Sequence, residues 1–366
     1  MYAAAFCATP PAGLQPDVVF DLPAPLARNG ELLRRLVSPL QARAMQRAMA
    51  GNPNALEASP LAPAQQHFAL YVPHAPAPAS GYALLVFVPP WKDARVPAEW
   101  IPVLDRNRIV FVTASESGND ANVLDRRDPL ALLAAYNAMQ RYHVDPSRVY
   151  VGGFSGGSRV ALRLALAYPD LFRGALLDAG SDPIGTTQVP LPPADLLHRF
   201  QQASRLVFLT GSDDLIRQAQ LARTVESLRQ WCVFDTSSIT LLHTGHALAD
   251  ASAFAQGLAA LAKPRAPDAA KIDACRARNA AALESEFGKA EALAHDARAG
   301  QAMQALTAID AHYGGIAAPR SVRLLQTLAS PGAPRRRARF RSVVLRLDPC
   351  ASKGKAWIRS RSSPHG

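Results

Sequence analysis

The stretch Val149–Gly157 constrains the fold of this chain more than any other. It reads as an apolar β-strand that runs into a Gly-x-Ser-x-Gly turn formed by Gly153, Ser155 and Gly157, and a helical run follows over 160–168. A sharp strand-to-helix turn of this kind places the serine hydroxyl above the sheet. Glycine two residues before and after the serine removes the Cβ atoms that would clash where strand and helix meet. The pattern predicts a nucleophilic serine at Ser155, with a purely structural turn as the alternative.

Buried strands and helices alternate along the middle of the chain. Apolar runs typical of strands buried in a parallel sheet occur at 68–73, 82–88, 108–114, 174–178 and 206–210, and a further strand is expected at 238–242. Helical segments are expected at 129–141, 215–228 and 247–261. This alternation predicts an α/β fold with a doubly wound, mostly parallel sheet.

The chain divides into four expected segments. They are an N-terminal helical extension (1–65), a catalytic domain (66–262), a helical appendage (263–330) and a basic tail (331–366). In the extension, 26–49 carries apolar residues at helical spacing and predicts one helix. The tail shows no apolar period and is expected to be disordered, with binding to an anionic surface as the alternative.

Charge separates the tail from the rest of the protein. The net charge is +11, but the tail alone holds ten Lys and Arg and one Asp, so the remaining residues carry only +2. That balance suits an ordinary soluble enzyme rather than a nucleic-acid binder. No apolar run approaches the length of a membrane span, so none is expected.

Two partners for Ser155 follow it in the chain. A serine needs a base within hydrogen-bond reach, and the base needs a carboxylate that holds its tautomer. Asp214 follows the strand 206–210, and His246 follows the strand 238–242. Both are expected at the carboxyl edge of the sheet, where the serine also lies. The spacing predicts a Ser155–His246–Asp214 triad.

Each partner has competitors. Asp213 is expected to point elsewhere and to cap the following helix. Asp178, at the end of the preceding strand, is a further candidate for the acid. His243 is expected in or at the end of its strand, with its ring packed or in solvent.

A triad also needs two backbone N–H groups that stabilise the oxyanion. Gly156, directly after the serine, is expected to supply one. The other is expected from the loop Pro89–Lys92, which follows the strand 82–88. Proline has no N–H, so Trp91 or Lys92 must donate, and we favour Trp91. Its ring is expected either to form a wall of the substrate pocket or only to cover the sheet edge.

The segment Asp145–Gly157 resembles the nucleophile region of the polyhydroxyalkanoate-depolymerase and feruloyl-esterase branch of the α/β-hydrolases, where D-P-x-R-V-Y-V leads into G-x-S-x-G-G. Ala167–Phe172 is similar to the stretch that closes that family's elbow helix, and the resemblance spans 68–262. It implies a serine esterase with Ser155 as nucleophile, Asp214 as acid and His246 as base. The departure lies at Pro89-Pro90, where many relatives have His-Gly.

These patterns favour a serine carboxylester hydrolase that acts on a small-molecule or polymer ester through an acyl-enzyme. A peptidase or amidase with the same triad is one alternative, and a non-catalytic binding module with the hydrolase fold is another. No metal cluster, P-loop or dinucleotide fingerprint occurs, so no cofactor is expected. The sequence leaves the oligomeric state open.

Two cysteines, Cys232 and Cys275, lie in segments expected to be ordered. A bridge between them would tie the helical appendage to the catalytic domain and would favour an exported protein, periplasmic or secreted. Two buried free thiols in a cytoplasmic protein are the alternative. The first twelve residues lack a basic n-region and read either as the remnant of a signal peptide or as a frayed end.

Overall fold

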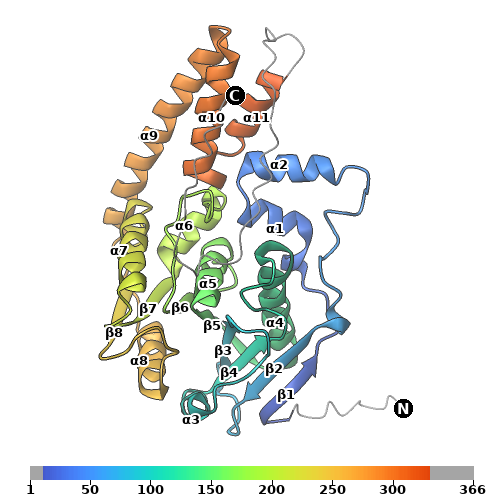
Figure 1. The fold of residues 1–366 in the computed structure, drawn as a ribbon, viewed down its shortest axis with the longest axis vertical. Helices are drawn as coiled ribbons and strands as arrows, with labels where there is room; N and C mark the ends of the chain where they lie inside the picture. Colours follow the sequence, from blue (N-terminus) through green and yellow to red (C-terminus); the bar gives the residue numbers. More distant parts are fainter. Residues whose placement is uncertain (1–10, 330–366) are drawn as a thin grey trace, which may run out of the picture.

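The computed structural model describes residues 11–329, which form an eight-stranded sheet covered by helices on both faces (Figure 1). The strand order is β1-β2-β4-β3-β5-β6-β7-β8. The pairs β1–β2 and β2–β4 are antiparallel, and the five other pairs are parallel. The predicted α/β fold with a mostly parallel sheet is therefore confirmed. The strands are β1 (Gly13–Val19), β2 (His67–Val72), β3 (Tyr82–Val88), β4 (Ile109–Ala114), β5 (Val144–Phe154), β6 (Gly174–Asp178), β7 (Arg205–Gly211) and β8 (Thr236–Leu241).

Helices follow most strands and lie on the two faces of the sheet. They are α1 (Asn29–Leu36), α2 (Pro39–Ala48), α3 (Ile101–Asn107), α4 (Asp128–Arg141), α5 (Gly156–Ala167), α6 (Ala194–Ala203), α7 (Leu215–Gln230), α8 (Ala251–Ala262), α9 (Ala269–His295), α10 (Ala299–Tyr313) and α11 (Arg320–Ala329).

Strand β3 shows why the central strands are apolar throughout. Its side chains alternate between two cores, as successive residues of a strand do. Leu84 and Val86 pack in the core that contains α4 and α5, whereas Leu85 and Phe87 pack in the core that contains α3 and α8. Burial on both faces removes the alternation of polar and apolar residues that marks a half-exposed strand.

The N-terminal extension differs from the prediction, since it contributes strand β1 to the sheet edge as well as helices. Pro16 lies within β1, and the register between β1 and β2 shifts between Gln15 and Val18. Proline cannot donate a ladder hydrogen bond, so an edge strand with an irregular register accommodates it. Because this short strand lacks a regular apolar alternation, the sequence pattern did not reveal it.

The single helix expected over 26–49 is also wrong. Helix α1 ends at Leu36, and α2 begins at Pro39. Proline lacks the N–H that would continue a hydrogen-bonded helix across this point, but it fits the first position of a new one. The helical spacing of apolar residues continues from α1 into α2 because both helices bury residues in the same core.

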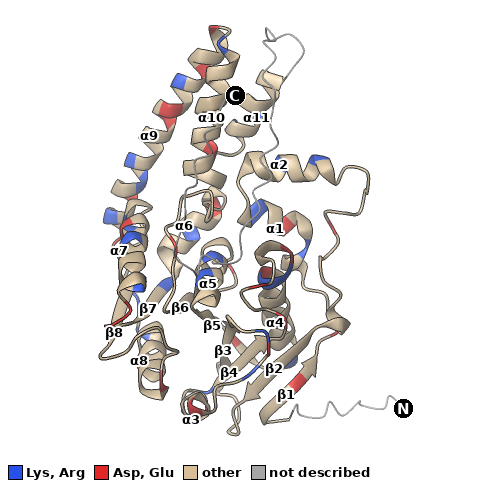
Figure 2. Cartoon of the chain, viewed as in Figure 1, with Lys and Arg blue, Asp and Glu red and all other residues tan. Residues whose placement is uncertain are grey.

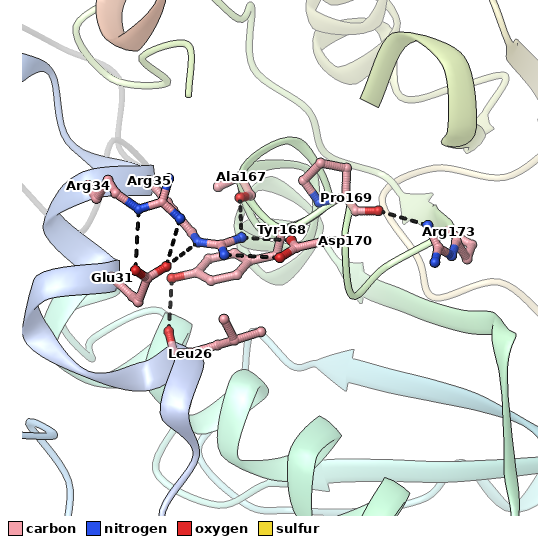
Figure 3. A network of polar contacts seen from close by, with 9 residues as sticks. All are labelled: Leu26, Glu31, Arg34, Arg35, Ala167, Tyr168, Pro169, Asp170 and Arg173. Carbon is pink, nitrogen blue, oxygen red and sulfur yellow. Dashed lines mark hydrogen bonds and ion pairs between the residues drawn. The ribbon is translucent and has the colours of Figure 1, made fainter. Parts of the chain in front are cut away.

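A buried arginine joins α1 to the end of the helix that follows the elbow (Figure 3). Arg35 donates two hydrogen bonds to Asp170, at 2.6 and 3.0 Å, and one to Glu31, at 2.6 Å. Its guanidinium also lies 4.7 Å from the ring centroid of Tyr168, whose hydroxyl donates to the Leu26 carbonyl. The buried arginine is thus fully paired, which limits the cost of its burial.

Helices α9, α10 and α11 follow the sheet and extend from one end of it, where α10 and α11 lie next to α2 and α9 packs on α10 (Figure 1). Asp310 of α10 accepts hydrogen bonds from the Ser38 hydroxyl, at 2.5 Å, and from the Leu40 N–H, at 3.0 Å. The N–H of Gly315 donates to the Leu191 carbonyl of the body at 2.7 Å. These contacts hold the helical segment to both the extension and the body, and the division into four segments stays a prediction.

Charged residues of both signs are interspersed along α9 (Figure 2). Lys289 pairs with Glu286, and Arg320 pairs with Glu284 and Glu291. The basic segment 331–366 lies outside the described residues. Within 11–329, no helix is both long and apolar enough to cross a membrane.

A disulfide joins Cys232, just after α7, to Cys275 in α9, with the two Cα atoms 5.7 Å apart. The bridge that the sequence left open is therefore present. Cross-linking residues that are 43 positions apart stabilises the folded state by roughly 3–4 kcal/mol in the chain-entropy model.

We expect the double substitution Cys232→Ser and Cys275→Ser to lower the free energy of unfolding by this amount. Urea unfolding with and without reductant checks it. The double variant serves as its own control, because reductant should leave its unfolding midpoint unchanged. Equal wild-type midpoints in both conditions would contradict the bridge.

Candidate active site

Ser155 stands at the junction of β5 and α5 in a strained backbone conformation. Its φ is 55° and its ψ is −118°, outside the regions that residues with a Cβ ordinarily adopt. Its N–H donates to the Asp178 carbonyl at 2.8 Å, which holds the turn against the end of β6. Such strain persists only where the surroundings impose it, and it is common at functional sites.

The flanking glycines are required by contact. A Cβ on Gly153 would overlap the backbone of Gly157, and one on Gly157 would overlap the Val88 carbonyl oxygen at the end of β3. The elbow helix can approach the strands this closely only without those side chains. The sequence pattern therefore reflects a real steric limit.

Ser155, His246 and Asp214 form one line of hydrogen bonds. The Ser155 Oγ lies 2.9 Å from His246 Nε2, and His246 Nδ1 lies 2.6 Å from Asp214 Oδ2. Since the carboxylate can only accept, Nδ1 carries the proton, and Nε2 is left to accept from the serine hydroxyl. The Asp214 side chain is 8% exposed and that of His246 is 38% exposed. The geometry is that of a nucleophile, a base and an orienting acid.

Each partner sits just past a strand. Asp214 is the N-cap of α7, and its Oδ1 accepts from the Arg217 N–H at 3.3 Å. His246 lies in the loop between β8 and α8, rather than at the start of a helix, since α8 begins only at Ala251. One carboxylate thus caps a helix and faces the histidine at the same time.

The loops of the acid and of the histidine are bonded to each other. Ser212 donates from its N–H to the Leu241 carbonyl at 2.8 Å, and Asp213 donates to the Thr244 carbonyl at 2.9 Å. The Ser212 hydroxyl in turn accepts from the His243 N–H at 2.8 Å. These three hydrogen bonds hold the loop after β7 against the loop after β8, and none of them involves His246.

The competitors lie elsewhere. Asp213 accepts from the Ser212 hydroxyl at 2.8 Å and does not cap α7, because Asp214 occupies that position. His243 is in a turn after β8, with a φ of 54°. Asp178 is 2% exposed, and its Oδ2 accepts from the Ala249 N–H at 2.8 Å. Its Oδ1 is buried with no hydrogen-bond partner among the described residues.

Burial raises the pKa of Asp178 to about 7, against a lowering by its hydrogen bond from Ala249. The native state therefore holds a proton that the unfolded chain releases near pH 4. The stability that the protonated Asp178 contributes is therefore fully present below about pH 4 and is lost as the pH rises to about 7.

We expect Asp178→Asn to be more stable than the wild type at pH 8, and the difference to shrink at pH 5. Asparagine stays neutral and still accepts from Ala249. Urea unfolding at the two pH values measures this, and kcat should stay within about tenfold because Asp178 does not contact His246. Identical pH dependence in the two proteins would contradict it.

The two proposed oxyanion donors belong to the start of α5 and to the loop after β3. Gly156 is the first residue of α5, so its N–H has no intrahelical acceptor. The N–H of Trp91 has no acceptor among the described residues either. The Trp91 ring lies 6.3 Å from both Phe87 and Phe154, and Phe154 stacks on His246 at 5.1 Å between centroids. The ring thus both covers the sheet edge and borders the site.

Sequence reasoning missed the loop that follows β4. The side chain of Asn119 covers the Cα of Gly156, where a Cβ would overlap Asn119 Oδ1. Arg127 donates from its guanidinium to the carbonyls of Ser117 and Pro89. No pattern in the sequence indicates these residues. They lie near the site because β3 and β4 are neighbours in the sheet, so that the loops after these two strands lie side by side.

No family model matches the chain. It is 47% identical over 53 residues to NocK of Nocardia uniformis subsp. tsuyamanensis, which is named as an esterase, and the match covers 14% of this chain and 13% of NocK.

Two solved structures are similar in fold. One is S-formylglutathione hydrolase (FrmB) from Staphylococcus aureus, with 12% identity, a TM-score of 0.41, and coverage of 54% of this chain and 93% of that one. The other is a ferulic acid esterase, with 14% identity, a TM-score of 0.40, and coverage of 53% and 89%. At such low identity and similarity, neither structure bears on the activity of this chain.

The strand order and the strand-to-helix elbow are those of the α/β-hydrolase fold. The chain has this fold. Among residues 11–329, no group of three or more His, Cys, Asp or Glu is placed to hold a metal ion.

Proposed function

We propose that the protein is a serine hydrolase that cleaves a carboxylic ester through an acyl-enzyme intermediate. The observation that carries the proposal is the line of two hydrogen bonds from Ser155 through His246 to Asp214, which starts at a strained elbow. Such a line converts a weak hydroxyl nucleophile into an effective one.

The proposed reaction uses the three side chains in turn. Ser155 Oγ bonds to the ester carbonyl carbon while His246 Nε2 takes its proton, and Asp214 stabilises the resulting imidazolium. The developing oxyanion would accept from the N–H groups of Gly156 and Trp91. As the bond to the leaving oxygen breaks, His246 returns the proton to the alcohol. Water then repeats the sequence and releases the acid.

Exposed aliphatic side chains near Asp214 and His246 in the sequence support a substrate with an apolar part. Leu215 and Ile216, next to Asp214, are 73% and 71% exposed, and Leu242 is 74% exposed. These are the most exposed large hydrophobic side chains among the described residues. Apolar groups that stay in water next to a site gain free energy when a ligand covers them.

The test combines a covalent probe with a substrate panel. A fluorophosphonate should label Ser155, and the protein should hydrolyse p-nitrophenyl esters, measured from acetate to long chains, together with methyl ferulate. Peptide mapping identifies the labelled serine. Faster cleavage of p-nitroanilides than of matched esters would favour a peptidase or amidase. A protein that neither labels nor turns over any substrate would be a binding module.

A further inference from the structure

The segment that would hold the second oxyanion donor begins with two prolines. We call residues 89–92 the oxyanion loop. Pro89 and Pro90 have no N–H, so this loop cannot be fixed by donating hydrogen bonds there. Its carbonyl groups must be fixed instead. Three of them accept hydrogen bonds: Pro89 from Arg127 Nη2 at 2.9 Å, Pro90 from the Asn119 N–H at 3.0 Å, and Lys92 from the Glu116 N–H at 2.7 Å.

All three donors belong to the chain just after β4. We call residues 115–122 the bracing loop, which supplies the N–H groups of Glu116 and Asn119. Arg127, five residues further on, is 3% exposed. Its Nε donates to the Ser117 carbonyl of the bracing loop at 2.9 Å, while its Nη2 donates to Pro89. One planar guanidinium therefore joins the two loops.

The bracing loop also reaches the first proposed donor. Asn119 lies against the Cα of Gly156 so closely that a Cβ there would overlap it. A shift of the bracing loop would therefore move the contacts of Gly156 and of the oxyanion loop together. Arg127 bonds to both loops, so its position affects both sides of the site.

Burying the Arg127 guanidinium is unfavourable in free energy. No carboxylate forms an ion pair with it among the described residues, and its neighbour Asp128 pairs with Arg163 instead, at 3.2 Å. Burial lowers the pKa of Arg127 to about 10, against a raising by the charges of Asp128 and Asp120, so it stays charged at neutral pH. A buried cation whose hydrogen bonds go to carbonyl oxygens rather than to a carboxylate stabilises a fold poorly, which favours a role in geometry.

We propose that Arg127 is a positioning residue that sets the oxyanion hole by clamping Pro89 to the bracing loop. The inference rests on the proposed function, since it assumes that an oxyanion forms beside Gly156 and Trp91. Arginine is suited to this task because its fork of N–H groups has a fixed shape, whereas lysine is a single flexible donor.

The experiment compares Arg127→Lys with Arg126→Lys. Arg126 is the matched control, because its Nε donates to the Glu116 carbonyl of the bracing loop, at 2.7 Å, and so contacts that loop without joining it to the oxyanion loop. Active sites are first titrated with a fluorophosphonate, so that kcat is expressed per functional serine. We expect R127K to lower kcat for p-nitrophenyl acetate by about 10–100-fold, because small misplacements of catalytic groups have effects of this size. KM should change by less than about threefold.

A transition-state analogue distinguishes positioning from a purely structural role. A trifluoromethyl ketone forms a hemiketal with Ser155 whose oxygen occupies the oxyanion hole. Its inhibition constant should rise in R127K by the same factor by which kcat falls, and R126K should match the wild type in both. If R127K does not fold, R127Q, which keeps a planar donor, is measured in the same way.

Several outcomes would overturn the inference. The inference is wrong if R127K has the kcat and the inhibition constant of the wild type. It is also wrong if R126K loses as much kcat as R127K does. Failure of both R127K and R127Q to fold would assign Arg127 a structural role only. A wild type that neither labels nor hydrolyses any ester removes the proposed function and this inference together, whereas an active wild type with an unaffected R127K removes the inference alone.

Discussion

Replacing Ser155 by alanine should lower kcat for ester hydrolysis by about 10⁴–10⁶-fold. The substitution removes the oxygen that lies 2.9 Å from His246 Nε2, and no other described hydroxyl is bonded to this histidine. The fold should persist, because the turn is held by the backbone bond from residue 155 to the Asp178 carbonyl and by the flanking glycines. Steady-state kinetics and circular dichroism of the purified variant check both parts.

Ser158→Ala is the matched control on the same helix. Its hydroxyl donates to the Gly180 carbonyl at 2.5 Å and is buried, so its loss should cost on the order of 1 kcal/mol of stability. Its kcat should remain within about tenfold of the wild type, since it does not contact His246. Activity within tenfold of the wild type in Ser155→Ala itself would rule out Ser155 as the nucleophile.

The second large effect is expected for Asp214→Asn, which should lower kcat by about 10⁴-fold. Asparagine can present an N–H to His246 Nδ1 and so favours the wrong tautomer. It is also a good N-cap, so the bond from the Arg217 N–H at the start of α7 can be kept. The substitution therefore separates the role of the carboxylate in catalysis from its role in the helix. An alanine in its place would lose both.

Asp213→Asn is the control, because its carboxylate is bonded to the Ser212 hydroxyl rather than to the histidine. Its kcat should fall far less. The reverse ranking of the two variants would move the acid to Asp213. A large loss confined to Asp178→Asn would instead place the acid at the end of β6.

The sequence indicated those features that depend on neighbours along the chain. The elbow could be predicted because Gly153 must lack a Cβ where the strand turns into the helix, and that limit acts within five residues. The limit on Gly157 comes instead from Val88 at the end of β3. The apolar runs of the central strands reveal a parallel sheet for a similar local reason, since both faces of each strand are covered. Strand β1 was not predicted, because this edge strand contains Pro16 and has neither a glycine-flanked turn nor a continuous apolar run.

The sequence order of serine, acid and histidine suggested the triad, but it left Asp213, Asp178 and His243 as competitors. In the structure, Asp214 is the only one of the three aspartates whose side chain is hydrogen-bonded to His246. That contact depends on the pairing of β7 with β8 and on the bonds between the loops that follow them. The bridge between Cys232 and Cys275 depends in the same way on how α9 returns to the end of α7.

By itself, then, the sequence determined the strained serine turn, the mostly parallel sheet and the small set of side chains from which an acid and a base would come. Only the tertiary structure decided which members of that set meet, and it alone placed Arg127 against Pro89 and Asn119 against Gly156. The physical reason is the range of the interactions. Steric and periodic constraints act between residues a few positions apart, whereas the contact of Arg127 with Pro89 joins residues 38 positions apart through the order of strands in the sheet.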